Sequence, residues 1–160
     1  SVGGAGTALV SGATVTAGGA WALTGTTEVT AGTLNYNAAG GSTTNLTVSG
    51  GTIGGAGLFT VSGTLSWTGG AFSGSAGTTR VLAGGTLSIS GTLTHTLQNY
   101  TVELAGTGIW TGTHTINAGS TGTLRVLSGG TLDIQGDPNF AYNLCVKRCK
   151  PSAPTSSCAY

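Results

Sequence analysis

Short stretches of alternating apolar and polar residues recur along the chain, and glycines separate them. Thr78-Thr-Arg-Val-Leu-Ala-Gly-Gly-Thr-Leu-Ser-Ile89 is repeated almost unchanged as Thr123-Leu-Arg-Val-Leu-Ser-Gly-Gly-Thr-Leu-Asp-Ile134. Alternation with a period of two is typical of a strand that buries one face and exposes the other. The Gly-Gly pairs allow sharp turns because glycine has no Cβ. The pattern therefore predicts strand, turn, strand units, and no segment keeps helical periodicity beyond one turn.

These units repeat along the chain. The glycine that opens each Gly-Thr-Leu or related unit falls at positions 32, 51, 63, 85, 106 and 130. Apart from the short step between 51 and 63, the intervals are about 20 residues, which lies in the range of solenoid repeats. Strands in such a repeat pair in parallel with the next coil at about 4.8 Å and share one core. We therefore expect an all-β parallel β-solenoid of roughly six to seven irregular coils, with a β-sandwich as the rival fold.

The composition changes near the C-terminus. Residues 137–160 hold all three cysteines, all three prolines and three of the five basic residues, and they contain no Gly-Thr-Leu unit. We therefore expect a solenoid domain over 1–136 and a separate tail over 137–160. That tail would be a cap or an arm between subunits.

The repeat strings resemble a known class of protein. Gly-Thr-Leu-Ser-Ile, Val-Ser-Gly-Gly-Thr-Ile and Trp-Thr-Gly-Gly are similar to the Gly/Thr-rich strand repeats of bacterial surface proteins, namely autotransporter passengers and filamentous-haemagglutinin-type adhesins. The resemblance covers about residues 6–136. It implies a secreted or cell-surface β-solenoid with an adhesive or structural role, and it transfers no catalytic residue.

Charge is scarce. Lys and Arg number five, Asp and Glu four, and glycine accounts for 31 of the 160 residues. Phosphate contacts need clustered cations, so we expect no nucleic-acid partner. No apolar run reaches the roughly 20 residues of a membrane-spanning helix. Most hydrolytic and metal-dependent sites use several carboxylates and histidines. Glu28, Glu103 and Asp133 lie on different predicted coils, so we expect neither enzymatic activity nor a cofactor.

Three cysteines lie in the tail, at Cys145, Cys149 and Cys158. In an oxidising compartment two would pair, and the third would be free or linked to another subunit. A zinc site with His95 or His114 is the competing interpretation, although the spacing lacks the usual two-residue knuckle.

The two histidines are separated by about one coil, so they could stack on one face. We favour the simpler interpretation that both are solvated.

Three further features are candidates for surface chemistry. Asn45-Leu-Thr47 and Asn99-Tyr-Thr101 are N-glycosylation sequons. Trp67 and Trp110 stand two repeat units apart in matching Trp-Thr-Gly strings, with Tyr36 in a similar context. An exposed ladder of these aromatics could stack on sugars, whereas packing at a coil corner is the interpretation we prefer. Threonine rows at 92–96 and 111–115 suggest ice binding, but the rows do not recur in every coil.

The predicted solenoid has two ends with unpaired backbone groups, which pair readily with other chains. Residues 1–12 contain no charge and no proline, so an amphipathic capping helix is not expected there. Either the chain is part of a longer repeat protein, or copies stack end to end. The expected function is an extracellular structural protein, a subunit of a self-assembling filament. The alternative is an adhesin segment that binds glycans at a cell surface.

Overall fold

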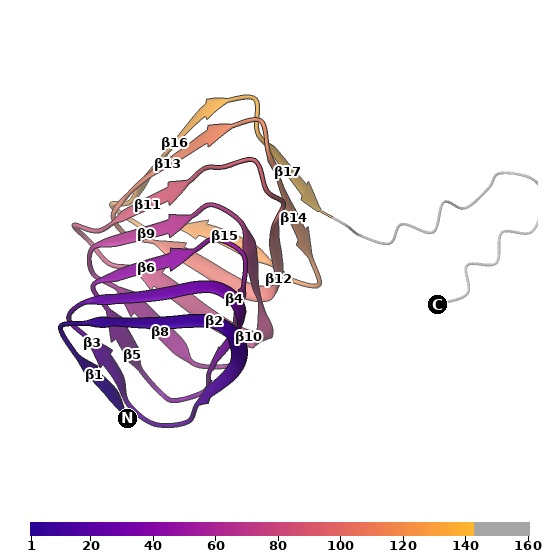
Figure 1. Ribbon diagram of the computed structural model, residues 1–160. Coiled ribbons are helices and arrows are strands. Elements are labelled where there is room, and N and C mark those ends of the chain that lie inside the picture. The colour runs from indigo at the N-terminus through magenta and orange to yellow at the C-terminus, as the bar shows by residue number, and fades with distance from the viewer. Residues whose placement is uncertain (143–160) are drawn as a thin grey trace, which may run out of the picture.

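The structure is a computed structural model that describes residues 1–142, and these residues form a parallel β-solenoid of about seven turns (Figure 1). Each turn adds one strand to each of three parallel ladders, which we call faces A, B and C. The described residues contain no helix, and therefore none that could cross a membrane. The expected solenoid is confirmed, and the sandwich alternative is wrong.

Face A carries seven strands in parallel register. They are β1 (Val2–Gly4), β3 (Trp21–Leu23), β5 (Gly41–Thr43), β8 (Leu58–Val61), the second half of β10 (Gly70–Val81), the second half of β12 (His95–Leu104) and β15 (Thr123–Val126).

Face B follows face A along each turn and also has seven strands. They are the first halves of β2 (Thr7–Ala17) and β4 (Thr26–Tyr36), then β6 (Asn45–Val48), β9 (Thr64–Trp67), β11 (Thr86–Ile89), β13 (Thr107–Gly112) and β16 (Thr131–Gly136).

Face C completes the turn. It is built from the second halves of β2 and β4, from β7 (Thr52–Gly54), from the first halves of β10 and β12, and from β14 (Thr115–Gly119) and β17 (Asn139–Tyr142). The long strands bend at a corner between two faces, and their register shifts there.

The three faces explain the irregular glycine intervals. Gly32 and Gly51 stand just before the face C strands, whereas Gly63 and Gly85 stand just before the face B strands. The short interval between Gly51 and Gly63 therefore joins two different corners and is not a short coil. On face B alone the register advances in nearly even steps, through Thr7, Thr26, Asn45, Thr64, Thr86, Thr107 and Thr131.

Alternate side chains of every strand point into the solenoid and stack in columns from one coil to the next. One column on face B shows the principle, because its register partners are buried through the middle coils. Its members in chain order are Val10, Val29, Val48, Trp67, Ile89, Trp110 and Ile134. Burying an aliphatic or aromatic side chain stabilises a fold by about 1.5–3 kcal/mol. The stacked columns are therefore the core that a single coil cannot form.

The ladder continues beyond the boundary expected at residue 136. Strand β17 pairs with β14 in parallel register, from Thr115↔Asn139 to Ala118↔Tyr142. The sequence pattern concealed this strand because it carries no Gly-Thr-Leu unit and follows the first of the prolines. The solenoid therefore includes at least residues 1–142.

Candidate assembly surfaces and the sites expected from sequence

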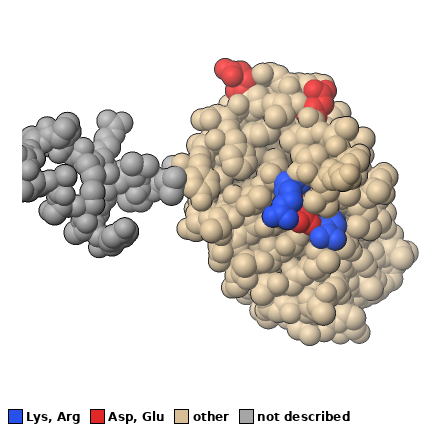
Figure 2. Space-filling model, turned by 180° about the vertical axis from the view of Figure 1, so that it is seen from behind, with Lys and Arg blue, Asp and Glu red and all other residues tan. Residues whose placement is uncertain are grey.

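Face A carries a ladder of three charged side chains. Arg80, Glu103 and Arg125 are register partners on successive coils. The Arg80 Nε lies 2.7 Å from Glu103 Oε2, and the Arg125 Nη1 lies 3.3 Å from Glu103 Oε1. Figure 2 shows an acidic side chain between two basic ones in the middle of the view, apart from the acidic groups at its upper edge. The Glu103 side chain is only 7% exposed, so its charge is committed to holding three coils in register.

Replacing Glu103 with alanine should lower the free energy of unfolding by about 1–3 kcal/mol, because it leaves two arginines without their shared acceptor. Glu28→Ala is the matched control, since Glu28 makes no ion pair within residues 1–142. Its effect should stay within about 0.5 kcal/mol. Urea unfolding followed by circular dichroism measures both. Equal losses in the two variants would show that the ladder does not stabilise the fold.

Face B carries a column of outward threonines that sequence reasoning missed. It occurs in every coil except the third, where Asn45 takes the position. Its threonines are Thr7, Thr26, Thr64, Thr86, Thr107 and Thr131. The available signal was a threonine that directly follows a glycine once per coil, rather than alternate threonines within one strand. The adjoining outward column is chemically mixed, since it contains Leu9, Glu28 and Asp133. The regular hydroxyl array is therefore one residue wide.

The three aromatics considered for sugar stacking lie inside the solenoid. Trp67, Trp110 and Tyr36 are 0%, 3% and 1% exposed. Trp67 packs edge-on against Phe72 with ring centroids 4.8 Å apart. Trp67 and Trp110 do stand in one column, as their spacing suggested, with Ile89 between them. Their rings offer no face to a surface ligand, so the exposed-ladder interpretation needs correcting. Period-two alternation could not tell the inner face from the outer one at these positions.

His95 and His114 stack on each other in the interior, and the interpretation of both as solvated side chains is wrong. They are 0% and 8% exposed, and their ring centroids lie 4.3 Å apart. The His95 ring nitrogens lie 2.8 Å from the Leu93 carbonyl oxygen and 3.1 Å from that of Trp67. Trp110 Nε1 donates to His114 Nε2 at 2.9 Å. The neutral His114 therefore carries its proton on Nδ1, which has no hydrogen-bond partner.

Burial is the main cause that lowers the pKa of both histidines. For His95 the adjacent His114 lowers the pKa further, and backbone carbonyls, chiefly that of Trp67, partly oppose the effect. For His114 the Gly91 backbone partly opposes it. Protonation of His114 would also place a hydrogen on Nε2 and so break the bond from Trp110. Burial therefore favours the neutral form of both rings.

The two sequon asparagines take part in contacts between coils. Asn45 Oδ1 accepts the Thr64 backbone N–H at 3.0 Å. Asn99 is exposed at a corner with a φ of 46°, and its Nδ2 donates to the Gly74 carbonyl at 2.8 Å. Glycan attachment at either position stays a prediction.

The expected cysteine cross-link and zinc site fall mainly on the tail. Cys145, Cys149 and Cys158 lie outside the described residues. Within residues 1–142, no three His, Cys, Asp or Glu side chains lie close enough together to hold a metal ion.

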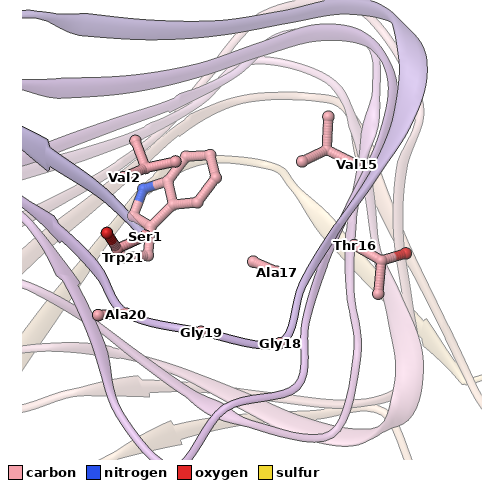
Figure 3. Close-up of a pocket in the computed structure, with 9 residues that line it drawn as sticks. All are labelled: Ser1, Val2, Val15, Thr16, Ala17, Gly18, Gly19, Ala20 and Trp21. Carbon is pink, nitrogen blue, oxygen red and sulfur yellow. The ribbon is translucent and has the colours of Figure 1, made fainter.

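The N-terminal end of the solenoid is hollow. Figure 3 shows a space bordered by β1, β2 and the start of β3, with Val2, Val15, Ala17 and Trp21 around it. The hollow has a volume of about 170 Å3. A cavity of about 150 Å3 holds a benzene ring, so this one has room for an aromatic side chain. No charged side chain occurs in residues 1–27.

The C-terminal end of the described solenoid exposes large apolar side chains. Val126, Ile134, Phe140 and Tyr142 are 43%, 55%, 40% and 46% exposed. Each continues a column whose members in the preceding coil are buried. They are inward residues without a following coil among residues 1–142, rather than surface residues. The two ends of the described solenoid are therefore a hollow and an apolar layer.

Comparisons with known proteins add nothing to what the structure shows of these surfaces. No protein-family model matches the chain, and no significant similarity is found to a curated protein or to a solved structure.

Proposed function

We propose that this protein is a structural subunit of an extracellular filament, assembled by end-to-end stacking of β-solenoids. One observation carries the proposal: inward apolar residues are exposed at both ends, although the columns they belong to are buried in the coils between. Val2 is 38% exposed, while its register partner Trp21 is 3% exposed. Ile134 is 55% exposed, while its partner Trp110 is 3% exposed. Another coil at either end would bury them.

The physical chemistry of the ends supports stacking over a free monomer. An uncovered terminal strand presents unpaired N–H and C=O groups that pair with other chains, and proteins usually protect such edges with charge or proline. Strands β1 and β2 contain neither. Because the two ends differ, their contact is head to tail and propagates unless rotation closes a ring. A filament is the expected product.

The extracellular location and the absence of catalysis belong to the same proposal. The resemblance of the Gly/Thr-rich repeats to bacterial surface proteins supports the location. A structural role also agrees with the ion pairs of Glu103, because its carboxylate already contacts two arginines. Glycan binding through Trp67, Trp110 or Tyr36 has no support, because all three are buried.

Electron microscopy and sedimentation velocity of the full chain, with reductant present, test the proposal. We expect unbranched fibres one solenoid wide, whose length grows with protein concentration. Two isoleucines make a matched pair, because Ile134 is exposed in the last coil and Ile109 is 43% exposed on the side of face B. Ile134→Glu should abolish assembly, because stacking would bury the new charge without a partner. Ile109→Glu should leave it intact.

Two results would overturn this proposal. One is a monodisperse monomer at every concentration of the unmodified chain. The other is assembly that survives Ile134→Glu and disappears with Ile109→Glu, because this would place the contact on the side of the solenoid.

A further inference from the structure

A column of glycines stands at the corner before face B, where adjacent coils approach closely. It occupies this corner in every coil except the third, which has Thr44. Its members are Gly6, Gly25, Gly63, Gly85, Gly106 and Gly130. A Cβ on Gly25 would overlap the Gly6 carbonyl oxygen, and one on Gly106 would overlap that of Gly85. Glycine is needed in these coils because the backbone of the preceding coil occupies the space of a side chain.

Gly6 is the member of this column that nothing in the structure constrains. A Cβ at Gly6 would meet no atom within 4 Å, and its φ lies outside the left-handed region. The described coils, residues 1–142, therefore impose no steric need for glycine there. Glycine would be required at position 6 if another coil packed against the N-terminal end, as the preceding coil does at the other glycines of the column.

We propose that this coil belongs to a second copy: residues 123–142 of one copy pair in parallel with residues 1–17 of the next, in the register of the solenoid itself. This inference rests on the proposed function and specifies its interface. Within the chain, Thr26 N–H donates to the Gly6 carbonyl at 3.1 Å, and Thr131 N–H to that of Gly106 at 3.0 Å. Continuing this pattern places the Thr7 N–H of the next copy on the Gly130 carbonyl.

The side chains of the two ends are complementary in this register. On face C the column containing Tyr142 begins at Val15, which borders the N-terminal hollow. The Tyr142 ring of one copy is thereby placed at the hollow of the next. The small inward residues of the first coil, such as Ala8 and Ala17, leave room for the larger ones of the last.

The charged residues of the last coil do not oppose this contact. Arg125, Asp133 and Asp137 are all exposed, and Arg125 and Asp133 point outward from their strands. Continuing the columns places Arg125 against Gly3 and Asp133 against Leu9 of the next copy. None of the three meets a charged side chain of the next copy's first coil, because residues 1–27 carry none.

Gly6→Val tests the close approach without disturbing the single coil. The matched control is Gly40→Val, since Gly40 also has no atom within 4 Å of its Cβ position, has no left-handed φ, and lies away from both ends. Both variants should unfold at the urea concentration of the unmodified chain. Only Gly6→Val should abolish fibres in electron microscopy.

A photo-cross-link identifies the contact directly. With p-benzoylphenylalanine in place of Tyr142, a mixture of light and heavy isotope-labelled chains should give cross-links between copies, from position 142 to residues 15–21. Cross-links only within one chain, including to residues 143–160, would overturn the inference. So would fibres that persist in Gly6→Val. If the register is overturned but the unmodified chain still forms fibres, the filament proposal survives. If the unmodified chain forms no fibres, both proposals fail.

Discussion

Replacing Gly106 with alanine is expected to cost at least about 4 kcal/mol of folding free energy, or to prevent folding altogether. The new Cβ would overlap the carbonyl oxygen of Gly85 and lie 2.8 Å from that of Leu82. All of these atoms belong to the backbone of the neighbouring coil, which cannot move without breaking the bond from Thr107 N–H to Gly85. Urea or thermal unfolding followed by circular dichroism measures the loss.

Gly6→Ala is the matched control, because it changes the same corner of the same column where no described atom lies within 4 Å of the new Cβ. Its free energy of unfolding should stay within about 0.5 kcal/mol of the unmodified protein. The measurement is made at low concentration, where the chains are monomeric. A Gly106→Ala protein as stable as Gly6→Ala would show that the coils are not packed as closely as the structure has them.

Acidification from pH 7.5 to pH 5 is the second change with a large expected effect. The fold lowers the pKa of His95 and His114, chiefly through burial. An unfolded histidine takes up its proton near pH 6.5, whereas the folded pair remains neutral to lower pH. Protons therefore favour the unfolded chain. Stability should be fully present above pH 6.5 and fall below it, by up to about 1.4 kcal/mol per pH unit for each histidine.

The chain is well suited to this test because it contains just two histidines. Urea unfolding at a series of pH values should give a falling free energy below pH 6.5. In a double variant with His95→Gln and His114→Gln, the slope between pH 6.5 and 5.5 should largely disappear, whatever its absolute stability. An unchanged slope in that variant would assign the acid sensitivity to other groups.

The histidine pair also shows where reasoning from sequence reached its limit. The separation of about one coil correctly suggested that the rings could stack. However, His95 and His114 are not register partners, because His95 pairs with Ile116 across β12 and β14. Each histidine stands among threonines in the sequence, and the same pattern would suit a solvated strand. His95 is buried because it takes an inward position of β12 in the column of Ile116, and His114 lies just before β14 with its ring beside Trp110.

The aromatics show a similar division. The interval between Trp67 and Trp110 correctly placed them in one column two coils apart. Local alternation defines two faces of a strand but does not label either as interior. Tyr36 is likewise buried, and it packs against Phe59 of a following coil at a centroid distance of 5.4 Å. Neighbouring coils, and not nearby residues in the sequence, decide which face of a strand is buried.

The sequence by itself determined that this chain is a series of similar units of strands and glycine turns, because those signals are local and recur. It therefore determined the parallel solenoid and the shortage of catalytic groups. The tertiary structure alone decided which corner each glycine occupies, which aromatic and histidine side chains are inward, and that Glu103 pairs with arginines on both adjacent coils. It also revealed the unfinished columns at both ends. Contacts between coils join residues that stand a full turn apart in the sequence, and only the register across the stack brings those residues together.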